Sequence, residues 1–205
     1  MTSMWYERVP THDDAAPTTA ICVCPPPRPG AGAAAMNIPA EIPAGPYRLR
    51  RWRPSDAEQV LRACQDPEIQ RWTTIPVPYT EEHAEGFLAG VGGSPLFAVT
   101  AHGDDVLGSF GLVAVEADRA EVGCWIAPWA RRLGVGEAAG RALTGWALDD
   151  TELTRLEWIA DAANEASLRL AERIGFLPAR MLPDHLENRD GTLSDAVLAV
   201  MREDR

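Results

Sequence analysis

The sequence predicts a mixed α/β domain with one parallel strand–helix–strand crossover inside an otherwise antiparallel sheet. Strand-like segments at 96–100, 106–115 and 119–126 follow one another with short turns between them, which is typical of an antiparallel meander. From Val135 the apolar residues recur at three- and four-residue spacing, which predicts a helix, and another strand-like segment follows at 155–160. A strand, a helix and a strand in this order favour a parallel crossover.

The chain divides into an N-terminal extension over residues 1–45 and a domain over residues 46–205. The extension is rich in proline, alanine and glycine and has no periodic apolar pattern, so we expect it to be disordered. Met36 lies inside it, just ahead of the domain. The first 35 residues are therefore either a linker-like extension or an artefact of start-site choice.

A strand at 47–53 and two helices are expected before the meander. Ser55 and Glu58 have the spacing of a capping box, which predicts that the first helix begins there and ends at Pro67. Thr80 is a good N-cap for the second helix, which a Gly-Gly-Ser-Pro sequence ends. After the crossover, the pattern predicts a helix that ends at a C-terminal glycine and then a last strand; these elements are expected at 163–174 and 194–201.

The composition limits the function. The chain has 30 acidic and 19 basic residues, a balance that argues against broad nucleic-acid binding, which needs a basic face. No apolar run approaches the roughly 20 residues of a membrane helix, and the N-terminus does not resemble a signal peptide, so we expect a cytoplasmic protein without a membrane partner. The 4 histidines are scattered and lack ligand spacing to the 4 cysteines, so no metal is expected.

The most informative motif is a glycine-rich run over residues 131–136, Arg-Arg-Leu-Gly-Val-Gly, between a predicted strand and a predicted helix. Glycines let the backbone turn tightly and bring its N–H groups close to an anion. The start of the helix would add free N–H groups and a positive dipole end. Arg131 and Arg132 add two positive charges, so the run is interpreted as a cradle for a diphosphate.

Glycine-rich runs of this kind also occur in Walker loops, in dinucleotide-binding loops and in plain turns. A Walker loop needs Lys and then Ser or Thr after its last glycine, and neither follows here. The dinucleotide fingerprint is satisfied in its permissive form by Gly134, Gly136 and Ala139, with Asp161 about twenty residues further on. In that motif, however, the strand runs straight into the first glycine, whereas residues 128–132 intervene here. A plain glycine-rich turn before a structural helix is the third alternative.

The run resembles motif A of the GNAT superfamily of N-acetyltransferases, which it matches at Arg131, Gly134 and Gly136. The resemblance extends over most of residues 46–204. Two further segments are similar to the family's fourth strand and to a later helix that begins with Asn and carries Ser and a closing Gly-Phe; these are residues 119–126 and 164–176. The segment 49–56 and the pair Arg71-Trp72 are similar to the RimJ/RimL branch, which acetylates N-terminal amines of ribosomal proteins and other amines.

The resemblance implies the GNAT fold, a central, mostly antiparallel sheet flanked by helices, with one splayed parallel crossover. It implies that acetyl-coenzyme A enters between the two parallel strands, its pyrophosphate on the loop amides and its pantetheine arm beside the strand and the later helix. The implied cofactor-binding residues are Trp125, Ile126, Arg131, Arg132, Leu133, Gly134, Val135, Gly136 and Asn164.

Transfer of an acetyl group from a thioester to an amine needs a base and a hydrogen-bond donor for the leaving thiolate. Glu121 is the candidate base, directly or through water, because it lies on the strand that leads to the thioester; the alternative is a solvent-facing carboxylate paired with Arg119. Ser167, carried over from the RimJ/RimL-type Asn-x-x-Ser pattern, is the candidate donor to the thiolate. The alternative is a small residue on a buried helix face.

The sequence therefore predicts an enzyme that transfers the acetyl group of acetyl-coenzyme A to a primary amine by direct attack. The acceptor is expected to be a protein or peptide N-terminus or a small-molecule amine, and the oligomeric state is left open. Two other functions stay open: a non-catalytic coenzyme A-binding sensor or interaction domain, and an NAD-dependent oxidoreductase built on the glycine fingerprint.

Overall fold

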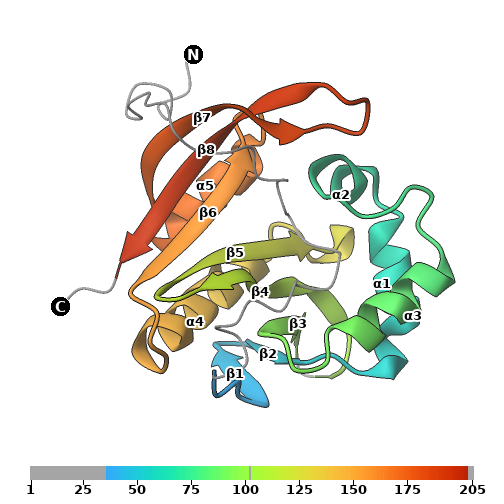
Figure 1. Cartoon of the computed structure of the whole chain (residues 1–205). Coiled ribbons are helices and arrows are strands. Elements are labelled where there is room, and N and C mark those ends of the chain that lie inside the picture. Colours follow the sequence, from blue (N-terminus) through green and yellow to red (C-terminus); the bar gives the residue numbers. More distant parts are fainter. Residues whose placement is uncertain (1–35, 102, 203–205) are drawn as a thin grey trace.

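Eight strands form one sheet in the part of the chain that the computed structural model describes, residues 36–101 and 103–202 (Figure 1). The strands are β1 (Glu41–Ala44), β2 (Tyr47–Arg51), β3 (Leu96–Thr100), β4 (Val106–Glu116), β5 (Arg119–Ile126), β6 (Arg155–Asp161), β7 (Leu177–Glu187) and β8 (Leu193–Arg202). Their order is β1-β2-β3-β4-β5-β6-β8-β7. Every neighbouring pair is antiparallel except β5 and β6, so the predicted mixed sheet is confirmed.

Helices cover both faces of this sheet. They are α1 (Ala57–Cys64), α2 (Pro67–Trp72), α3 (Glu81–Gly90), α4 (Val135–Asp149) and α5 (Glu165–Ile174), with short 3-10 turns η2 (Pro54–Asp56) and η3 (Pro128–Ala130). Phe97 of β3 packs edge-on against Trp146 of α4. Phe97 is paired with Phe110 and Phe110 with Cys124, so Cys124 of β5 lies on the same face of the sheet as Phe97. Trp125 follows Cys124 in β5 and therefore points to the opposite face. On that opposite face Trp125 lies beside Trp52, which contacts Phe87 of α3.

The parallel crossover is splayed, as predicted. β5 and β6 are in register from Arg119 opposite Arg155 to Glu121 opposite Glu157. Beyond this point the two strands separate, while β5 continues to Ile126 and β6 pairs on with β8. A gap therefore opens in the middle of the sheet, and α4 and α5 both begin beside it.

The predicted boundary of the extension is wrong at its end. Glu41–Ala44 forms strand β1, which pairs with β2, although residues 1–45 were expected to hold no sheet ladder. Ile42 and Ala44 are buried, and Gly45 turns the chain with φ of 66°. Pro43 is tolerated because β1 is the edge strand, where a missing N–H costs no internal ladder bond. Residues 1–35 of the extension lie outside the described residues.

The predicted start of the first helix is also corrected. Ser55 lies in the 3-10 turn η2, and α1 begins after Asp56, whose side chain makes no capping bond to the helix. Pro67 does not only end a helix: it opens α2, where a missing N–H is harmless at the first position. The capping role of Thr80 is confirmed, since its side chain accepts a hydrogen bond from the backbone of His83 at the start of α3.

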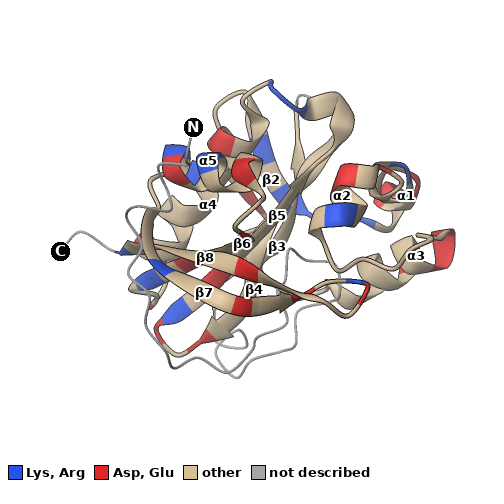
Figure 2. Cartoon of the chain, turned by 90° about the horizontal axis from the view of Figure 1, so that it is seen from above, with Lys and Arg blue, Asp and Glu red and all other residues tan. Residues whose placement is uncertain are grey.

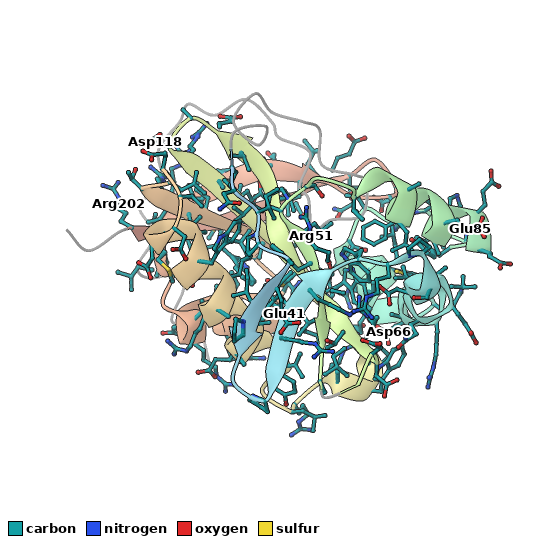
Figure 3. All side chains as sticks on the ribbon, turned by 90° about the horizontal axis from the view of Figure 1, so that it is seen from below. Glu41, Arg51, Asp66, Glu85, Asp118 and Arg202 are labelled. Atoms are coloured by element: carbon teal, nitrogen blue, oxygen red, sulfur yellow. The ribbon has the colours of Figure 1, made fainter. Side chains whose placement is uncertain are left out.

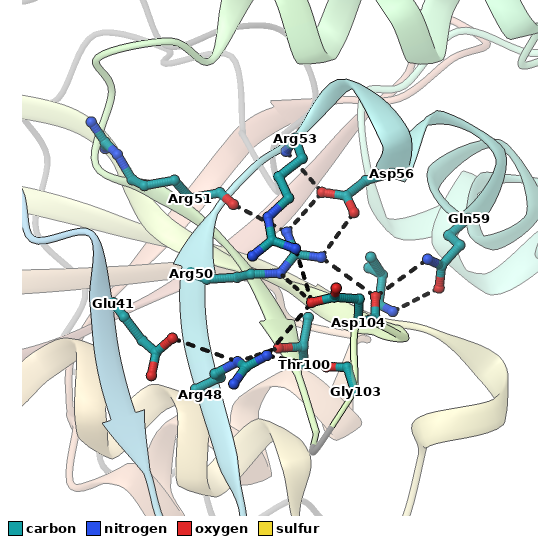
Figure 4. A network of polar contacts seen from close by, with 11 residues as sticks. Glu41, Arg48, Arg50, Arg51, Arg53, Asp56, Gln59, Thr100, Gly103 and Asp104 are labelled. Carbon is teal, nitrogen blue, oxygen red and sulfur yellow. Dashed lines mark hydrogen bonds and ion pairs between the residues drawn. The ribbon is translucent and has the colours of Figure 1, made fainter.

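A buried charge pair explains why Asp56 does not cap α1. Arg50 of β2 donates two hydrogen bonds of 2.8 Å to the two carboxylate oxygens of Asp56, and both side chains are almost fully buried (Figure 4). Asp104, in the turn between β3 and β4, pairs with Arg53 at 3.0 Å. Gln59 of α1 donates to the backbone carbonyl of Asp104. This network joins the first strands to α1 and pairs the buried charges of Arg50 and Asp56, so we assign it a structural role.

The end of α5 agrees with prediction, whereas β7 was not predicted. α5 ends at Gly175, which has φ of 123°, a conformation that glycine adopts without strain. β7 contains two prolines and pairs with β8 through two register shifts, so it lacks the regular alternation of a strand. The β7–β8 hairpin extends toward α2 on the other side of the gap (Figure 1).

Candidate active site

Two cavities meet where β5 and β6 separate. The loop cavity, lined by the glycine-rich loop and the starts of α4 and α5, has a volume of about 680 Å³. The hairpin cavity, lined by the tip of the β7–β8 hairpin and by β6, has a volume of about 500 Å³. The two cavities share Trp72, Thr73, Cys124, Asn164 and Ser167. Because these residues line both cavities, a ligand in one can reach a ligand in the other at this point.

The glycine-rich loop reaches the loop cavity through two residues in the left-handed conformation. Gly134 has φ of 78° and is the N-cap of α4, and Arg132 has φ of 64°. This conformation is free of strain for glycine but costs an arginine about 1 kcal/mol. The first backbone N–H groups of α4 have no acceptor within the helix, and Gly134, Val135 and Gly136 line the cavity. The loop therefore offers an anion-binding helix start to the cavity.

Gly136 leaves room where three elements converge. A Cβ atom at this position would lie 3.1 Å and 3.2 Å from the two methyl carbons of Leu170 on α5, and 3.6 Å from Ile126 on β5. Contacts near 3.1 Å are tighter than most real Cβ contacts, so any side chain here narrows the wedge between β5 and α5. The glycine keeps this wedge of the loop cavity open.

The charge of Arg131 is held by a carboxylate. Its guanidinium lies 2.5 Å from Oδ1 of Asp66, which also caps α2 by accepting from the backbone N–H groups of Glu68 and Ile69. Burial by itself would raise the pKa of Asp66, but the hydrogen bonds from Arg131 and from these amides outweigh it, so the pKa lies below its usual value. Arg131 lines the loop cavity, and its charge is already paired with Asp66.

Further positive charge at the loop cavity comes from α5, where no sequence motif predicted it. Arg169 and Arg173 of α5 line this cavity, and Arg132 is exposed beside the loop. Basic and acidic residues are mixed along α5, and Arg169 pairs with Glu165 at 2.8 Å (Figure 2). The loop cavity thus combines backbone N–H groups with several guanidinium groups, which is the chemistry of a phosphate site.

Leu133 is not among the described residues that line either cavity. Its side chain is 60% exposed, and its carbonyl oxygen accepts a hydrogen bond of 2.6 Å from the hydroxyl of Tyr47 in β2. This bond fastens the loop to the sheet, so Leu133 supports the loop through its backbone.

Ser167 lies at the meeting point of the cavities. Asn164 is the N-cap of α5, and its Oδ1 accepts a hydrogen bond from the backbone N–H of Ser167. The indole Nε1 of Trp158 on β6 donates a hydrogen bond of 3.0 Å to Oγ of Ser167. Both Asn164 and Ser167 line the loop cavity and the hairpin cavity, so the structure brings these two predicted residues together with Trp125 and Ile126 of β5.

Glu121 lies on a different part of β5. It is 7% exposed, so the alternative of a solvent-facing carboxylate is wrong. Arg119 forms ion pairs with Glu116 at 2.6 Å and with Glu157 at 3.7 Å. Glu121 is in register with Glu157 of β6, at the last parallel pair before the strands separate, and it is not among the described residues that line either cavity. Glu121 therefore lies next to the gap between β5 and β6, behind the residues that line the two cavities.

The hairpin cavity is closed on one side by a contact between distant segments. Arg189, at the tip of the β7–β8 hairpin, donates to the backbone carbonyls of Gln70, Thr73 and Ile75 at 2.9 Å, 2.9 Å and 2.7 Å. These carbonyls lie at and just after the end of α2, where a positive charge is favourable. Trp72 of α2 lines both cavities, and its Nε1 donates to Glu68. No local pattern marks Arg189 as part of the site, because its partners are more than 110 residues away.

Neither a metal centre nor a membrane-spanning helix is found in the described part of the chain. No group of three or more His, Cys, Asp or Glu residues within it is arranged to hold a metal ion. No helix among the described residues combines the length and the apolar character needed to cross a membrane.

Known proteins share this fold. An acetyltransferase of the GNAT family from Bacillus anthracis superposes with a TM-score of 0.73 at 19% identity, over 80% of this chain and 99% of that one. The structure of RimL, a ribosomal L7/L12 alpha-N-protein acetyltransferase, in complex with coenzyme A superposes with a TM-score of 0.72 at 17% identity, over 80% of this chain and 98% of that one.

Sequence comparison agrees with the fold. A Bacillus subtilis (strain 168) protein named "Putative ribosomal N-acetyltransferase YdaF" is 42% identical over 59 residues, which are 29% of this chain and 32% of that protein. The match thus spans about a third of that relative's length. Residues 47–177, well over half of the chain, match the family described as acetyltransferase (GNAT) domain. The protein therefore belongs to the GNAT acetyltransferase family.

Proposed function

We propose that this protein is an N-acetyltransferase that transfers the acetyl group of acetyl-coenzyme A directly to a primary amine. The observation that carries the proposal is the meeting of two cavities at Ser167, inside the gap between β5 and β6. The loop cavity has the features of a phosphate site. None of the described residues that line the hairpin cavity belongs to the glycine-rich loop. A two-substrate transfer needs such an arrangement, because both substrates must reach one point from separate sides.

The residues of the loop cavity fit coenzyme A. The left-handed Gly134 and the first amides of α4 suit the pyrophosphate, and the open wedge at Gly136 leaves a path along β5. Trp125 and Ile126 line that path, the backbone of β5 is no longer paired with β6 at their positions, and Asn164 lines the same cavity from α5. Arg132 supplies a charge that no described residue neutralises by an ion pair, whereas Arg131 acts through its pair with Asp66. Acetyl-coenzyme A supplies an activated acetyl group as a thioester.

The chain's own residues then serve the transfer. Ser167 donates a hydrogen bond to the sulfur as the C–S bond breaks, which stabilises the leaving thiolate. Glu121, buried at the point where β5 and β6 separate, receives the proton of the attacking amine through water. The family match covers these segments, which supports an enzyme rather than a binding module.

The acceptor proposed first is the α-amine of a protein N-terminus. Two of the proteins named above, the Bacillus subtilis relative and RimL, are described as a ribosomal N-acetyltransferase and a ribosomal alpha-N-protein acetyltransferase, which supports this class. An α-amine has a pKa near 8 and a lysine side chain one near 10.4, so a larger fraction of the α-amine is neutral and reactive at pH 7. A small-molecule amine is the second acceptor class to test.

The test begins with calorimetric titration of the full chain with acetyl-coenzyme A, with NAD as the parallel ligand. We expect 1:1 binding of acetyl-coenzyme A alone, and then release of free thiol with peptides that have an unblocked N-terminus. The matched control is the same peptide with a blocked N-terminus and one internal lysine. Binding without turnover on peptides and on a panel of small amines would favour the coenzyme A-binding sensor, and binding of NAD would contradict the proposal.

Two observations weigh against the NAD-dependent alternative. β5 passes into the 3-10 turn η3 before the glycine loop, instead of running into the first glycine. Both carboxylate oxygens of Asp161, the acidic residue of that fingerprint, are engaged: Oδ1 by the backbone of Ala163 and Oδ2 by the hydroxyl of Ser194 at 2.6 Å.

A further inference from the structure

We infer that Trp158 is a positioning residue for the transfer, because its indole N–H fixes the Ser167 hydroxyl so that its proton points to the leaving sulfur. This inference rests on the proposed function and on the donor role of Ser167. It adds a residue that neither the glycine motif nor the Asn-x-x-Ser pattern contains.

The position of Trp158 in the sheet is the first observation. Glu157 is the last residue of β6 that pairs with β5, and Trp158 is the first one beyond it. Its side chain is 2% exposed and packs between Phe110 of β4 and Phe176, with ring centroids 6.4 Å and 5.5 Å away. The ring is therefore held rigidly at the edge of the gap, and it lines the hairpin cavity.

The direction of the hydrogen bond is the second observation. An indole Nε1 can only donate, so in the 3.0 Å contact the oxygen of Ser167 must accept. The proton of the hydroxyl is thus not used in this bond. A serine inside a helix often donates back to a carbonyl of the preceding turn, but Ser167 Oγ donates to none of the residues that the structure describes. The proton is available to a ligand in the cavities that Ser167 lines.

Two contacts together leave Ser167 little freedom. Its backbone N–H is held by Asn164 Oδ1 at 3.1 Å, which fixes the start of α5, and its Oγ is held by Trp158. A hydroxyl that accepts a hydrogen bond also becomes a better donor, because the two bonds polarise each other. Trp158 therefore both orients the hydroxyl and strengthens its donation.

Atoms and charges balance in this transfer. The amine nitrogen forms a C–N bond to the acetyl carbon, the C–S bond breaks, and its electron pair moves to the sulfur of coenzyme A. Ser167 donates a hydrogen bond to that sulfur while the charge develops. The proton that the amine loses matches the proton that the free thiol gains, so no oxidant or further reactant is required.

The test is a double-mutant cycle on the full chain with Trp158→Phe and Ser167→Ala. Trp158→Phe keeps an aromatic ring in the core and removes the N–H donor. We expect kcat to fall about tenfold in Trp158→Phe, with the Kd of acetyl-coenzyme A and the KM of the acceptor unchanged. In the Ser167→Ala background, the same change is expected to have no further effect on kcat.

Trp146→Phe is the matched control. Trp146 is a buried tryptophan of α4 that packs on Phe97 and is not among the described residues of either cavity lining, so kcat is expected to stay unchanged. An equal loss of kcat from Trp158→Phe in both backgrounds would overturn the inference, since the indole would then act through packing. An unchanged kcat in Trp158→Phe would overturn it as well. Failure of the proposed function would differ from both, because the wild-type chain would then transfer no acetyl group.

Discussion

Asp66 and Arg131 form an ion pair that joins the start of α2 to the start of the glycine-rich loop. Nη2 of Arg131 lies 2.5 Å from Oδ1 of Asp66, and Nη1 lies 3.3 Å from Oδ2. Asp66 lies where α1 passes into α2 (Figure 3). Asp66 is also the N-cap of α2, and residues of α2 line both cavities. A single carboxylate therefore holds α2 in place against the glycine-rich loop.

Replacing Asp66 should separate its two roles. We expect Asp66→Ala to lower the free energy of unfolding by about 1–2 kcal/mol, because it removes the cap of α2 and leaves Arg131 without its partner. Asp66→Asn is the matched control, since asparagine caps a helix as well as aspartate does but carries no charge. Urea unfolding measures both variants. Equal stability of Asp66→Ala and the wild type would contradict the assignment.

The same pair predicts a pH dependence of stability. The pKa of Asp66 is lower in the folded protein than the value of about 3.9 for an unfolded aspartate. The stabilisation by its charge is therefore complete above pH of about 4 and is lost as the pH falls through the folded-state pKa. Between pH 7 and pH 3 the free energy of unfolding should fall more steeply for the wild type than for Asp66→Asn. Parallel curves of the free energy of unfolding against pH would contradict a stabilising role for the Asp66 charge.

Gly136→Trp should abolish binding of acetyl-coenzyme A. The side chain starts within 3.2 Å of Leu170 and close to Ile126, so it must fill the wedge of the loop cavity. Calorimetric titration is expected to show no heat of binding. Gly145→Ala serves as the control on the same helix, because its Cβ would meet nothing closer than 3.9 Å. Wild-type affinity in Gly136→Trp would mean that the cofactor binds elsewhere.

Glu121→Gln tests the candidate base. If the carboxylate receives the amine proton, kcat is expected to fall by about 10²-fold or more with little change in the Kd of acetyl-coenzyme A. The control is Glu157→Gln, which changes the carboxylate in register with Glu121 and leaves Glu121 itself intact. A pH–rate profile that is the same in Glu121→Gln and in the wild type would remove Glu121 from the mechanism.

Arg189→Ala tests the contact that closes the hairpin cavity. The guanidinium bonds to three carbonyls at the end of α2, and its loss should free this helix from the β7–β8 hairpin. We expect the KM of the acceptor to rise severalfold, with a loss of about 1 kcal/mol in the free energy of unfolding. For Arg189→Lys we expect a KM and a stability between those of the wild type and of Arg189→Ala, since an ammonium group reaches fewer carbonyls at once. A normal KM in Arg189→Ala would separate the hairpin from acceptor binding.

Much of the fold could be predicted because local patterns decide it. β3 and β5 have the predicted bounds, α4 begins at Val135, and α5 ends at Gly175. Apolar periodicity and the conformational freedom of glycine act within a few residues, so a single sequence reveals them. The parallel crossover followed from the order of these elements, since a strand, a helix and a strand have few ways to pack.

The elements that were not predicted depend on partners far along the chain. β1 and β7 contain prolines and lie at the two edges of the sheet, where pairing to β2 and β8 overrides a weak local preference. α2 has 6 residues, too few for a periodic pattern, and its capping by Asp66 became visible only in the structure.

The candidate site likewise combines features that consecutive residues encode with contacts between residues far apart in the chain. The chemistry of the loop around Gly134 and Gly136 was encoded in consecutive residues, and all of residues 131–136 except Leu133 line the loop cavity. The pairing of Arg131 with Asp66 joins residues 65 positions apart, and the bond from Trp158 to Ser167 crosses from a strand to a helix. Such contacts follow from how strands splay and helices pack in three dimensions. No local pattern records them, and tertiary structure alone decided which side chains meet at the gap.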